Sequence, residues 1–309
     1  MVGVAGAHGV KRIEIDYVLT VPVALRACFT VQGFTALLGR SGAGKTTLLR
    51  ALAGLAPARG EPWQGLAPER RPIGYLPQQT LLFPHLNVLE NTAYALKGRR
   101  RLEQAGTLLA ELGLAALASR RADQLSGGQA KRIALARALA HGAELLLLDE
   151  PSVGLDSVTR DATLDWLVET ATARGIPMLA ATHDHEVATR AERLALLADG
   201  RIIQHGPARE VFSAPMGHAA ATLLGYENIF ERGDEVWAIR ARDIRLDPAG
   251  ERFSVLRVRE LGTSLRLVCG PAPRLTVELP HGRAHDYPPG REIRLCLAAA
   301  ARVEPASGT

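Results

Sequence analysis

Short apolar runs and predicted helices alternate along the first two thirds of the chain. Residues 34–38, 145–148 and 176–182 are apolar runs of strand length, and a helix is expected after the first of them, from Lys45. The pair Asp199-Gly200 separates two further apolar runs and is a strong signal for a two-residue hairpin. Strands that alternate with helices are typical of a largely parallel sheet, so this pattern predicts an α/β fold.

Two later parts of the chain have a different pattern. Leucine and alanine recur every three or four residues through residues 93–118, which predicts a helical subdomain over about residues 85–141, inserted into the α/β core. From about Tyr226, short alternating runs are separated by glycine and proline, a pattern typical of a small all-β barrel or sandwich. The predicted domains are residues 1–225 and residues 226–309.

Composition narrows the class of protein. The 309 residues are 47% hydrophobic and 5% aromatic. The chain can therefore bury a core, but it lacks the aromatic residues of a stacking platform for single-stranded nucleic acid. No apolar run reaches the roughly 18 residues of a membrane span. We also expect no signal peptide, and three widely spaced cysteines indicate a reducing compartment, so a cytoplasmic protein is predicted.

The basic charge allows two interpretations. The formal net charge is +5, and the densest basic run is residues 99–101, with Arg120 and Arg121 nearby. Such a run can bind nucleic acid, but a solvated helix face is the more common explanation. We favour the solvated face and expect no nucleic-acid partner.

A phosphate-binding loop is the first motif that carries chemistry. Residues 39–46 match the pattern G-x-x-x-x-G-K-[ST] between a predicted strand and a predicted helix. Backbone N–H groups can close around phosphates there, Lys45 can reach the β- and γ-phosphates, and Thr46 can ligate Mg²⁺. The alternative is a glycine-rich turn, and the motif alone does not separate kinases, GTPases and transport ATPases. The candidate nucleotide-binding residues are Gly39, Arg40, Ser41, Gly42, Ala43, Gly44, Lys45, Thr46 and Thr47.

Two carboxylates follow the apolar run at residues 145–148. Asp149 stands where it can hold Mg²⁺, and Glu150 beside it can polarise an attacking water as a general base. Strands often end in charged residues, so this pair indicates a nucleotide site only in combination with the phosphate loop that precedes it.

The string Leu125-Ser-Gly-Gly-Gln129 makes the assignment specific. The sequence resembles the ATP-binding cassette ATPases, the motor subunits of ABC transporters, whose signature motif is identical to this string. A serine and two glycines before a helix form a second anion site. The resemblance implies that this site caps ATP held by the opposite subunit of a head-to-tail dimer. Its residues are Ser126, Gly127, Gly128 and Gln129.

The other motifs of this family follow in order. The resemblance implies that Gln78 contacts Mg²⁺ and the attacking water and senses the membrane partner. Residues 152–156, which end at Asp156, match the loop that crosses the dimer interface, and His183 matches the switch histidine that contacts the γ-phosphate. The implied catalytic residues are Glu150, His183 and Gln78, and the implied Mg²⁺ ligands are Thr46, Gln78 and Asp149.

The resemblance covers about residues 12–215, with three departures. The segment between Gly54 and Gln78 is short, so we expect a trimmed antiparallel sheet there. Ala130 replaces a polar residue after the signature glutamine, with little expected effect. Tyr17 lies at about the right distance before the phosphate loop to stack on adenine, but a plain strand tyrosine is an equal alternative.

The C-terminal part resembles the TOBE-type β domain of importers that use a solute-binding protein. Residues 239–246 look like the stretch that opens this domain. Residues 29–39, 70–75 and 81–85 resemble the ATPase subunits of molybdate importers, although sulfate, iron and polyamine relatives share part of this pattern. The fold class predicted in this way is a P-loop ATPase cassette, with a RecA-like core and a helical subdomain, followed by a small all-β, OB- or TOBE-like domain.

The resemblance also implies cofactors and partners. ATP and Mg²⁺ are the expected cofactors. The expected partners are a second ATPase subunit, which is either an identical copy or a paralogue, the membrane permease and, through the permease, a solute-binding protein. The expected location is the cytoplasmic side of the inner membrane. A nucleic-acid-acting cassette protein is the alternative class, but such proteins normally carry two cassettes or a long coiled coil.

Overall fold

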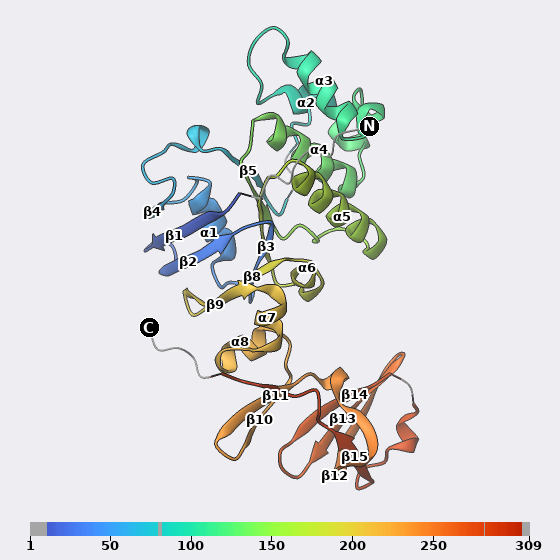
Figure 1. The fold of residues 1–309 in the computed structure, drawn as a ribbon. Coiled ribbons are helices and arrows are strands. Elements are labelled where there is room, and N and C mark those ends of the chain that lie inside the picture. Colours follow the sequence, from blue (N-terminus) through green and yellow to red (C-terminus); the bar gives the residue numbers. More distant parts are fainter. Residues whose placement is uncertain (1–10, 80–81, 281, 305–309) are drawn as a thin grey trace, which may run out of the picture. The chain divides into compact units, whose positions relative to one another are not determined.

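The computed structural model describes residues 11–79, 82–280 and 282–304. Leu81, in one of the importer-like phrases, and the first ten residues lie outside these ranges. The chain divides into two compact units, residues 1–209 and residues 210–309 (Figure 1). This boundary lies earlier than the predicted one between residues 225 and 226, because the helical residues 210–224 group with the β-rich unit.

Nine strands of the described residues form the sheet of the first unit, in the order β4-β1-β2-β9-β8-β3-β7-β6-β5. Strand β3 pairs in parallel with β7 and with β8, and β6 pairs in parallel with β5 and with β7. The centre of the sheet is therefore parallel, as the alternating pattern predicts. The strands are β1 (Ile13–Leu19), β2 (Leu25–Val31), β3 (Phe34–Gly39), β4 (Arg59–Glu61), β5 (Ile73–Leu76), β6 (Leu145–Asp149), β7 (Met178–Thr182), β8 (Arg193–Ala198) and β9 (Arg201–Pro207).

The central strands are apolar on both faces because helices cover the sheet. Every residue of β3, β6 and β7 is buried, which fits strands at the centre of a parallel sheet. The helices of this unit, in chain order, are α1 (Lys45–Leu52), α2 (Val88–Ala93), α3 (Arg101–Glu111), α4 (Gly127–Ala140), α5 (Ser157–Ala173) and α6 (His185–Thr189). Three of these helices, α2, α3 and α4, occupy the predicted helical segment at residues 85–141 (Figure 1).

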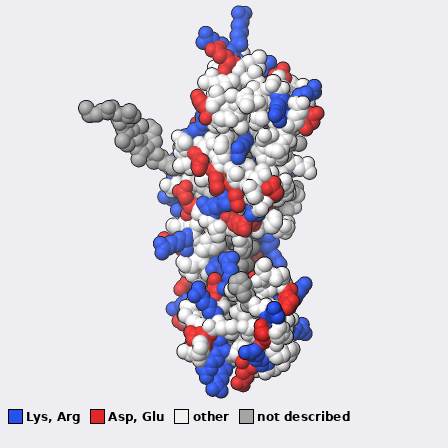
Figure 2. Space-filling view, turned by 90° about the vertical axis from the view of Figure 1, so that its right-hand side faces the viewer, with Lys and Arg blue, Asp and Glu red and all other residues white. Residues whose placement is uncertain are grey.

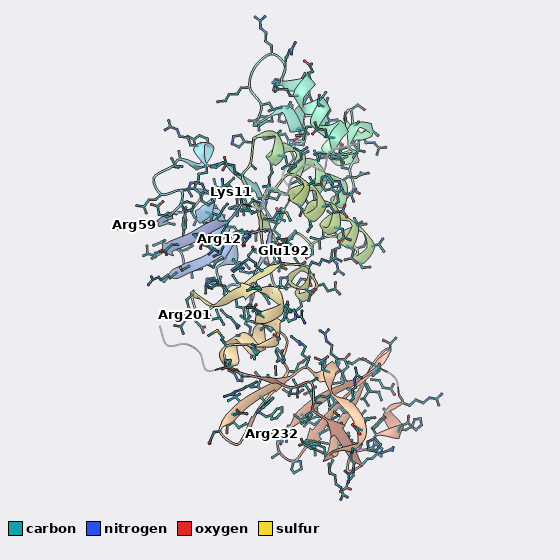
Figure 3. The ribbon with its side chains drawn as sticks, viewed as in Figure 1. Lys11, Arg12, Arg59, Glu192, Arg201 and Arg232 are labelled. Carbon is teal, nitrogen blue, oxygen red and sulfur yellow. The ribbon has the colours of Figure 1, made fainter. Side chains whose placement is uncertain are left out.

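An antiparallel flank completes the first sheet. Strand β1 pairs antiparallel with β2 and β4, and β4 has only three residues, in line with the trimmed sheet expected from the short segment after Gly54. Several basic side chains belong to this part of the sheet, including Arg59 on β4 and Arg201 on β9 (Figure 3). Arg12 pairs with Glu14 of β1 at 2.5 Å.

The second unit is built mainly from two small antiparallel sheets. Their strand orders are β10-β11-β16 and β14-β13-β12-β15, and their shared core includes Phe253, Leu267 and Cys269. The strands are β10 (Asn228–Arg232), β11 (Glu235–Ile239), β12 (Arg245–Leu261), β13 (Ser264–Gly270), β14 (Leu275–Leu279), β15 (Glu292–Cys296) and β16 (Ala301–Arg302). Helices α7 (Ala208–Ser213) and α8 (Gly217–Leu223) precede them in the chain.

Surface charge is mixed on one face of the molecule. Basic and acidic side chains are interspersed over the face shown in Figure 2. The run at residues 99–101 is exposed, and Arg100 lies 3.6 Å from the Glu103 carboxylate. Within the ranges that the structure describes, no helix is both long enough and apolar enough to cross a membrane.

Candidate nucleotide site

The phosphate loop joins the end of β3 to the start of α1. Gly42 and Gly44 adopt φ values of 82° and 98°, which residues with a side chain rarely reach. At Gly39 a Cβ atom would lie 2.8 Å from the carbonyl oxygen of Leu197, so β8 also requires a glycine there. Because the loop turns on these glycines, the N-terminus of α1 opens towards a cavity of about 280 Å³.

The cavity brings together nine of the residues predicted from the sequence. They come from the phosphate loop, from the segment after β5, from the end of β6 and from the segment after β7. Converging motif residues from four chain segments are typical of a ligand site. These residues are Ser41, Gly42, Gly44, Lys45, Thr46, Thr47, Gln78, Glu150 and His183.

Lys45 holds its ammonium group within the phosphate loop. The side chain is 6% exposed, and Nζ donates hydrogen bonds to the carbonyl oxygens of Gly39 at 2.8 Å and Arg40 at 3.2 Å. The ammonium also lies 3.5 Å from Oε1 of Glu150. A buried cation beside the N-terminus of α1 gives the cavity a positive wall that suits an anion.

Asp149 at the end of β6 is held by two hydroxyl groups. Thr46 donates to one carboxylate oxygen at 3.0 Å, and Tyr75 donates to the other at 3.3 Å. Burial raises the pKa of Asp149, while these two hydrogen bonds act in the opposite direction. The role of Tyr75 was missed from the sequence, although its position three residues before Gln78, on the adjacent strand β5, is the signal that could have found it.

Glu150 is buried, with one paired oxygen and one unpaired oxygen. Its Oε1 lies 3.0 Å from Nδ1 of His183, whereas its buried Oε2 has no hydrogen-bond partner within the described residues. The residue adopts φ = 49°, an uncommon conformation for a residue other than glycine, and such strain clusters at functional sites. An unpaired buried carboxylate oxygen can accept a hydrogen bond, and then a proton, from a water molecule.

The residues of this cavity fit ATP and Mg²⁺. Glycine turns and a buried lysine form a phosphate cradle. On the cavity wall, the hydroxyl group of Thr46 and the amide of Gln78 are oxygen ligands of the kind that Mg²⁺ prefers. The carboxylate of Asp149 is a third such ligand, which lies behind the wall and accepts a hydrogen bond from Thr46. The orphaned Oε2 of Glu150 leaves one acceptor for a reacting water.

The signature motif and Asp156 lie outside this cavity. Ser126 caps α4 by accepting a hydrogen bond from the N–H of Gln129 at 3.3 Å, and no residue of 126–129 lines the cavity wall. Asp156 caps α5 by accepting from the N–H of Thr159 at 3.0 Å, a bond that lowers its pKa. These residues therefore lie apart from the phosphate-loop cavity of their own chain.

Tyr17 does not serve as the adenine-stacking residue in this structure, which corrects one candidate. Its side chain is 1% exposed within the core of the first unit, and its hydroxyl accepts a 3.4 Å hydrogen bond from Arg71. A ring enclosed on both faces cannot stack on a base. The exposed residue Val23, in the turn between β1 and β2, lies on the cavity wall instead. No motif in the sequence marks Val23.

Comparisons with known proteins agree with this geometry. The ABC transporter family profile matches residues 26–153. A molybdate/tungstate import ATP-binding protein, WtpC, of Thermococcus kodakarensis is 38% identical over 235 residues, which cover 72% of this chain and 71% of the relative. A spermidine/putrescine import ATP-binding protein, PotA 1, of Pseudomonas aeruginosa is 35% identical, and the match covers 96% of this chain and 91% of the relative.

A solved structure shares the cassette fold. It is a dimeric ATP-binding cassette in a post-hydrolysis state, bound to ADP and Pi, with a TM-score of 0.51 and 26% identity. The match covers 64% of this chain and 99% of that chain. Together with the family profile and the relatives, this likeness shows that the chain belongs to the ABC transporter family, as an ATP-binding subunit that couples ATP hydrolysis to transport.

Proposed function

We propose that this ATPase drives a solute-binding-protein-dependent importer, with molybdate or a related oxyanion as the cargo. The observation that carries the motor role is the environment of Glu150. This buried carboxylate has His183 and Lys45 on one oxygen and, within the part of the chain that the structure describes, no partner on the other. Such a group is suited to orienting a water against a phosphate.

Five side chains in or beside the cavity have defined tasks in this proposal. Bound Mg²⁺·ATP supplies the transferable phosphoryl group and a divalent charge that offsets the phosphates. Lys45, whose ammonium group donates to two loop carbonyl oxygens, would donate to phosphate oxygens, and Thr46 and Asp149 would hold the metal. Oε2 of Glu150 takes the hydrogen bond of the attacking water, and His183 keeps the carboxylate in place. Catalysis is then mostly positioning and electrostatic stabilisation.

A complete site requires a second subunit. The signature residues 126–129 and Asp156 stand outside the cavity of their own chain, so the proposal assigns them to the nucleotide of a head-to-tail partner. The cycle of closing and reopening reaches the permease through Gln78, which lies on the cavity wall and follows β5. The proposed location is the cytoplasmic face of the membrane, with the subunit bound to the permease.

The cargo is proposed from resemblance and not from a binding residue. A relative named for molybdate/tungstate import and a relative named for spermidine/putrescine import both match this chain. The phrases at residues 29–39 and 70–75 favour the first cargo. Sulfate or thiosulfate, ferric iron and polyamines remain the alternatives.

The proposed cargo is tested by element analysis of cells that lack this gene. With scarce molybdate in the medium, we expect a selective loss of cellular molybdenum, which is rescued by excess molybdate or by the wild-type gene but not by the Glu150→Gln gene. Iron and sulfur are measured in the same samples. Unchanged molybdenum together with loss of another element would replace the cargo and keep the motor role.

A further inference from the structure

Lys131 joins the helix of the signature motif to the loop that follows Glu150. It lies in the first turns of α4 and is 8% exposed. Its Nζ donates hydrogen bonds to the carbonyl oxygens of Pro151 at 2.5 Å and Val153 at 2.8 Å. Among the described residues, no carboxylate forms an ion pair with Lys131. The two carbonyl groups are therefore the acceptors of this buried ammonium group.

Close packing reinforces this connection on the same side of α4. A Cβ atom at Gly127 would lie 3.2 Å from Leu155, and one at Gly128 would lie 2.7 Å from the Thr159 side chain. The signature glycines therefore also let the start of α4 approach the loop before α5 and the first turn of α5. Both segments are fixed to each other through side-chain packing and through the two bonds of Lys131.

Burying the ammonium group of Lys131 costs free energy that its hydrogen bonds must offset. Removing a lysine ammonium from water requires compensation by hydrogen bonds, and an apolar side chain of similar length would not carry that cost. The two carbonyl groups belong to residues on either side of Ser152, at the start of the loop 152–156. What the ammonium secures is thus the course of this loop relative to α4.

We propose that Lys131 is a positioning residue that locks the signature segment 126–129 and the loop 152–156 into one rigid block, which is presented as a unit to the nucleotide of the partner subunit. This inference rests on the proposed function, because both segments act across the dimer there. Lys131 is not among the residues that line the nucleotide cavity of its own chain. Its loss should therefore weaken dimer closure and leave nucleotide binding by the single subunit in place.

The test uses the full chain with Glu150→Gln as the parent, so that ATP is not consumed. Lys131→Met removes both hydrogen bonds and keeps the length of the side chain, and the exposed Lys97→Met is the matched control. Mass is followed by light scattering over a protein concentration series with ATP, and nucleotide affinity is measured by fluorescence of a labelled ATP. We expect the concentration for half-dimerisation to rise about tenfold or more in Lys131→Met, since each lost bond came from a charged donor. We expect nucleotide affinity within twofold of the parent.

A second variant separates positioning from folding. Lys131→Arg keeps a charged donor and should recover part of the lost dimerisation. A dimer of parental strength in Lys131→Met would overturn the inference, and so would a loss of nucleotide affinity that matches the loss of dimerisation, because Lys131 would then only support the fold. A parent that stays monomeric with ATP would contradict the proposed function and the inference together, whereas a dimeric parent with an unaffected variant contradicts the inference alone.

Discussion

At the residue scale, two adjacent carboxylates have different neighbours, which suit the different tasks that we propose for them. Asp149 accepts hydrogen bonds from two hydroxyl groups, and Glu150 is paired through one oxygen with His183 and Lys45. Two carboxyl groups in environments that differ in this way can take different roles in one reaction. The motif pattern predicted both carboxylates, but only the structure shows that Tyr75 holds one of them.

Removal of His183 should slow hydrolysis without preventing nucleotide binding. In His183→Ala, Glu150 loses its 3.0 Å partner and becomes free to leave the geometry needed to orient water. We expect a fall in the ATPase turnover rate of about 100-fold, typical for a positioned acid or base group, with nucleotide affinity changed little. His141→Ala, at the exposed C-cap of α4, is the control. Full turnover in His183→Ala would remove this residue from the mechanism.

Removal of the Tyr75 hydroxyl should weaken the response to Mg²⁺. Tyr75→Phe deletes one of the two donors that orient Asp149, so we expect the Mg²⁺ concentration for half-maximal ATPase activity to rise by about three- to tenfold, the worth of one hydrogen bond. Tyr17→Phe is matched to it, because that hydroxyl contacts Arg71 and not Asp149. Equal Mg²⁺ dependence of ATPase activity in the two variants would show that the hydrogen bond from Tyr75 to Asp149 does not contribute to the Mg²⁺ response.

At the element scale, helix α1 is fixed at both ends by the residues around it. Its first turn follows the bend of the phosphate loop, and its last turn is capped by the buried guanidinium of Arg71. This group donates to the carbonyl oxygens of Ala51 at 2.8 Å and Leu52 at 2.6 Å. A cation at a helix C-terminus satisfies carbonyl groups that have no partner within the helix. Arg71, which lies between β4 and β5, thus holds helix α1 in place.

Loss of this cap should destabilise the first unit. Arg71→Met removes the donors to Ala51 and Leu52 and leaves their carbonyl groups buried. We expect a decrease of about 2–4 kcal/mol in the free energy of unfolding, measured by urea denaturation. The adjacent exposed Arg70→Met should change it by less than about 0.5 kcal/mol. Equal stability of the two variants would contradict the capping role of Arg71.

Elements were predicted well where one local signal decides the structure. The Asp199-Gly200 pair forms the β8–β9 hairpin, with φ values of 49° and 71° at the two residues, as a two-residue turn requires. Tyr17 illustrates the opposite case. Its distance from the phosphate loop allowed both a stacking role and a core role. In the structure Tyr17 lies on the buried face of β1, whose residues alternate between buried and exposed, and Arg71 from a distant segment donates to its hydroxyl group. The alternation is visible in the sequence, whereas the contact with Arg71 leaves no periodic trace in it.

At the scale of the whole molecule, the division into two units follows from separate hydrophobic cores. The strand pattern after Tyr226 predicted the second unit, but the helical residues 210–224 at its start were assigned to the first domain. Helices α7 and α8 precede residue 226 and so fall within the first predicted domain, residues 1–225. Tyr226 shows why they group otherwise, since its hydroxyl donates to the carbonyl oxygen of Phe212 at 2.7 Å within the second unit. The sequence pattern around these helices contains no sign of that contact.

The reactivity of Cys269 should report whether the second unit is folded. Burial raises the pKa of Cys269 to about 11, so at pH 8 its thiol stays protonated and lacks the reactive thiolate. We expect iodoacetamide at pH 8 to modify the exposed Cys28 and to leave Cys269 unmodified until denaturant opens the unit. Peptide mass analysis measures both sites in one sample. Modification of Cys269 at the rate of Cys28 in native protein would contradict the packed core.

The most direct measurement of the motor assignment is the mass of the Glu150→Gln protein with ATP. Light scattering is recorded for the same sample without nucleotide, with ADP and with ATP. We expect the mass to double only with ATP, with two ATP molecules retained per dimer, because each subunit supplies the signature residues 126–129 that its own cavity lacks. A protein that binds ATP and remains monomeric at all concentrations would contradict the shared site, and with it the proposed mechanism.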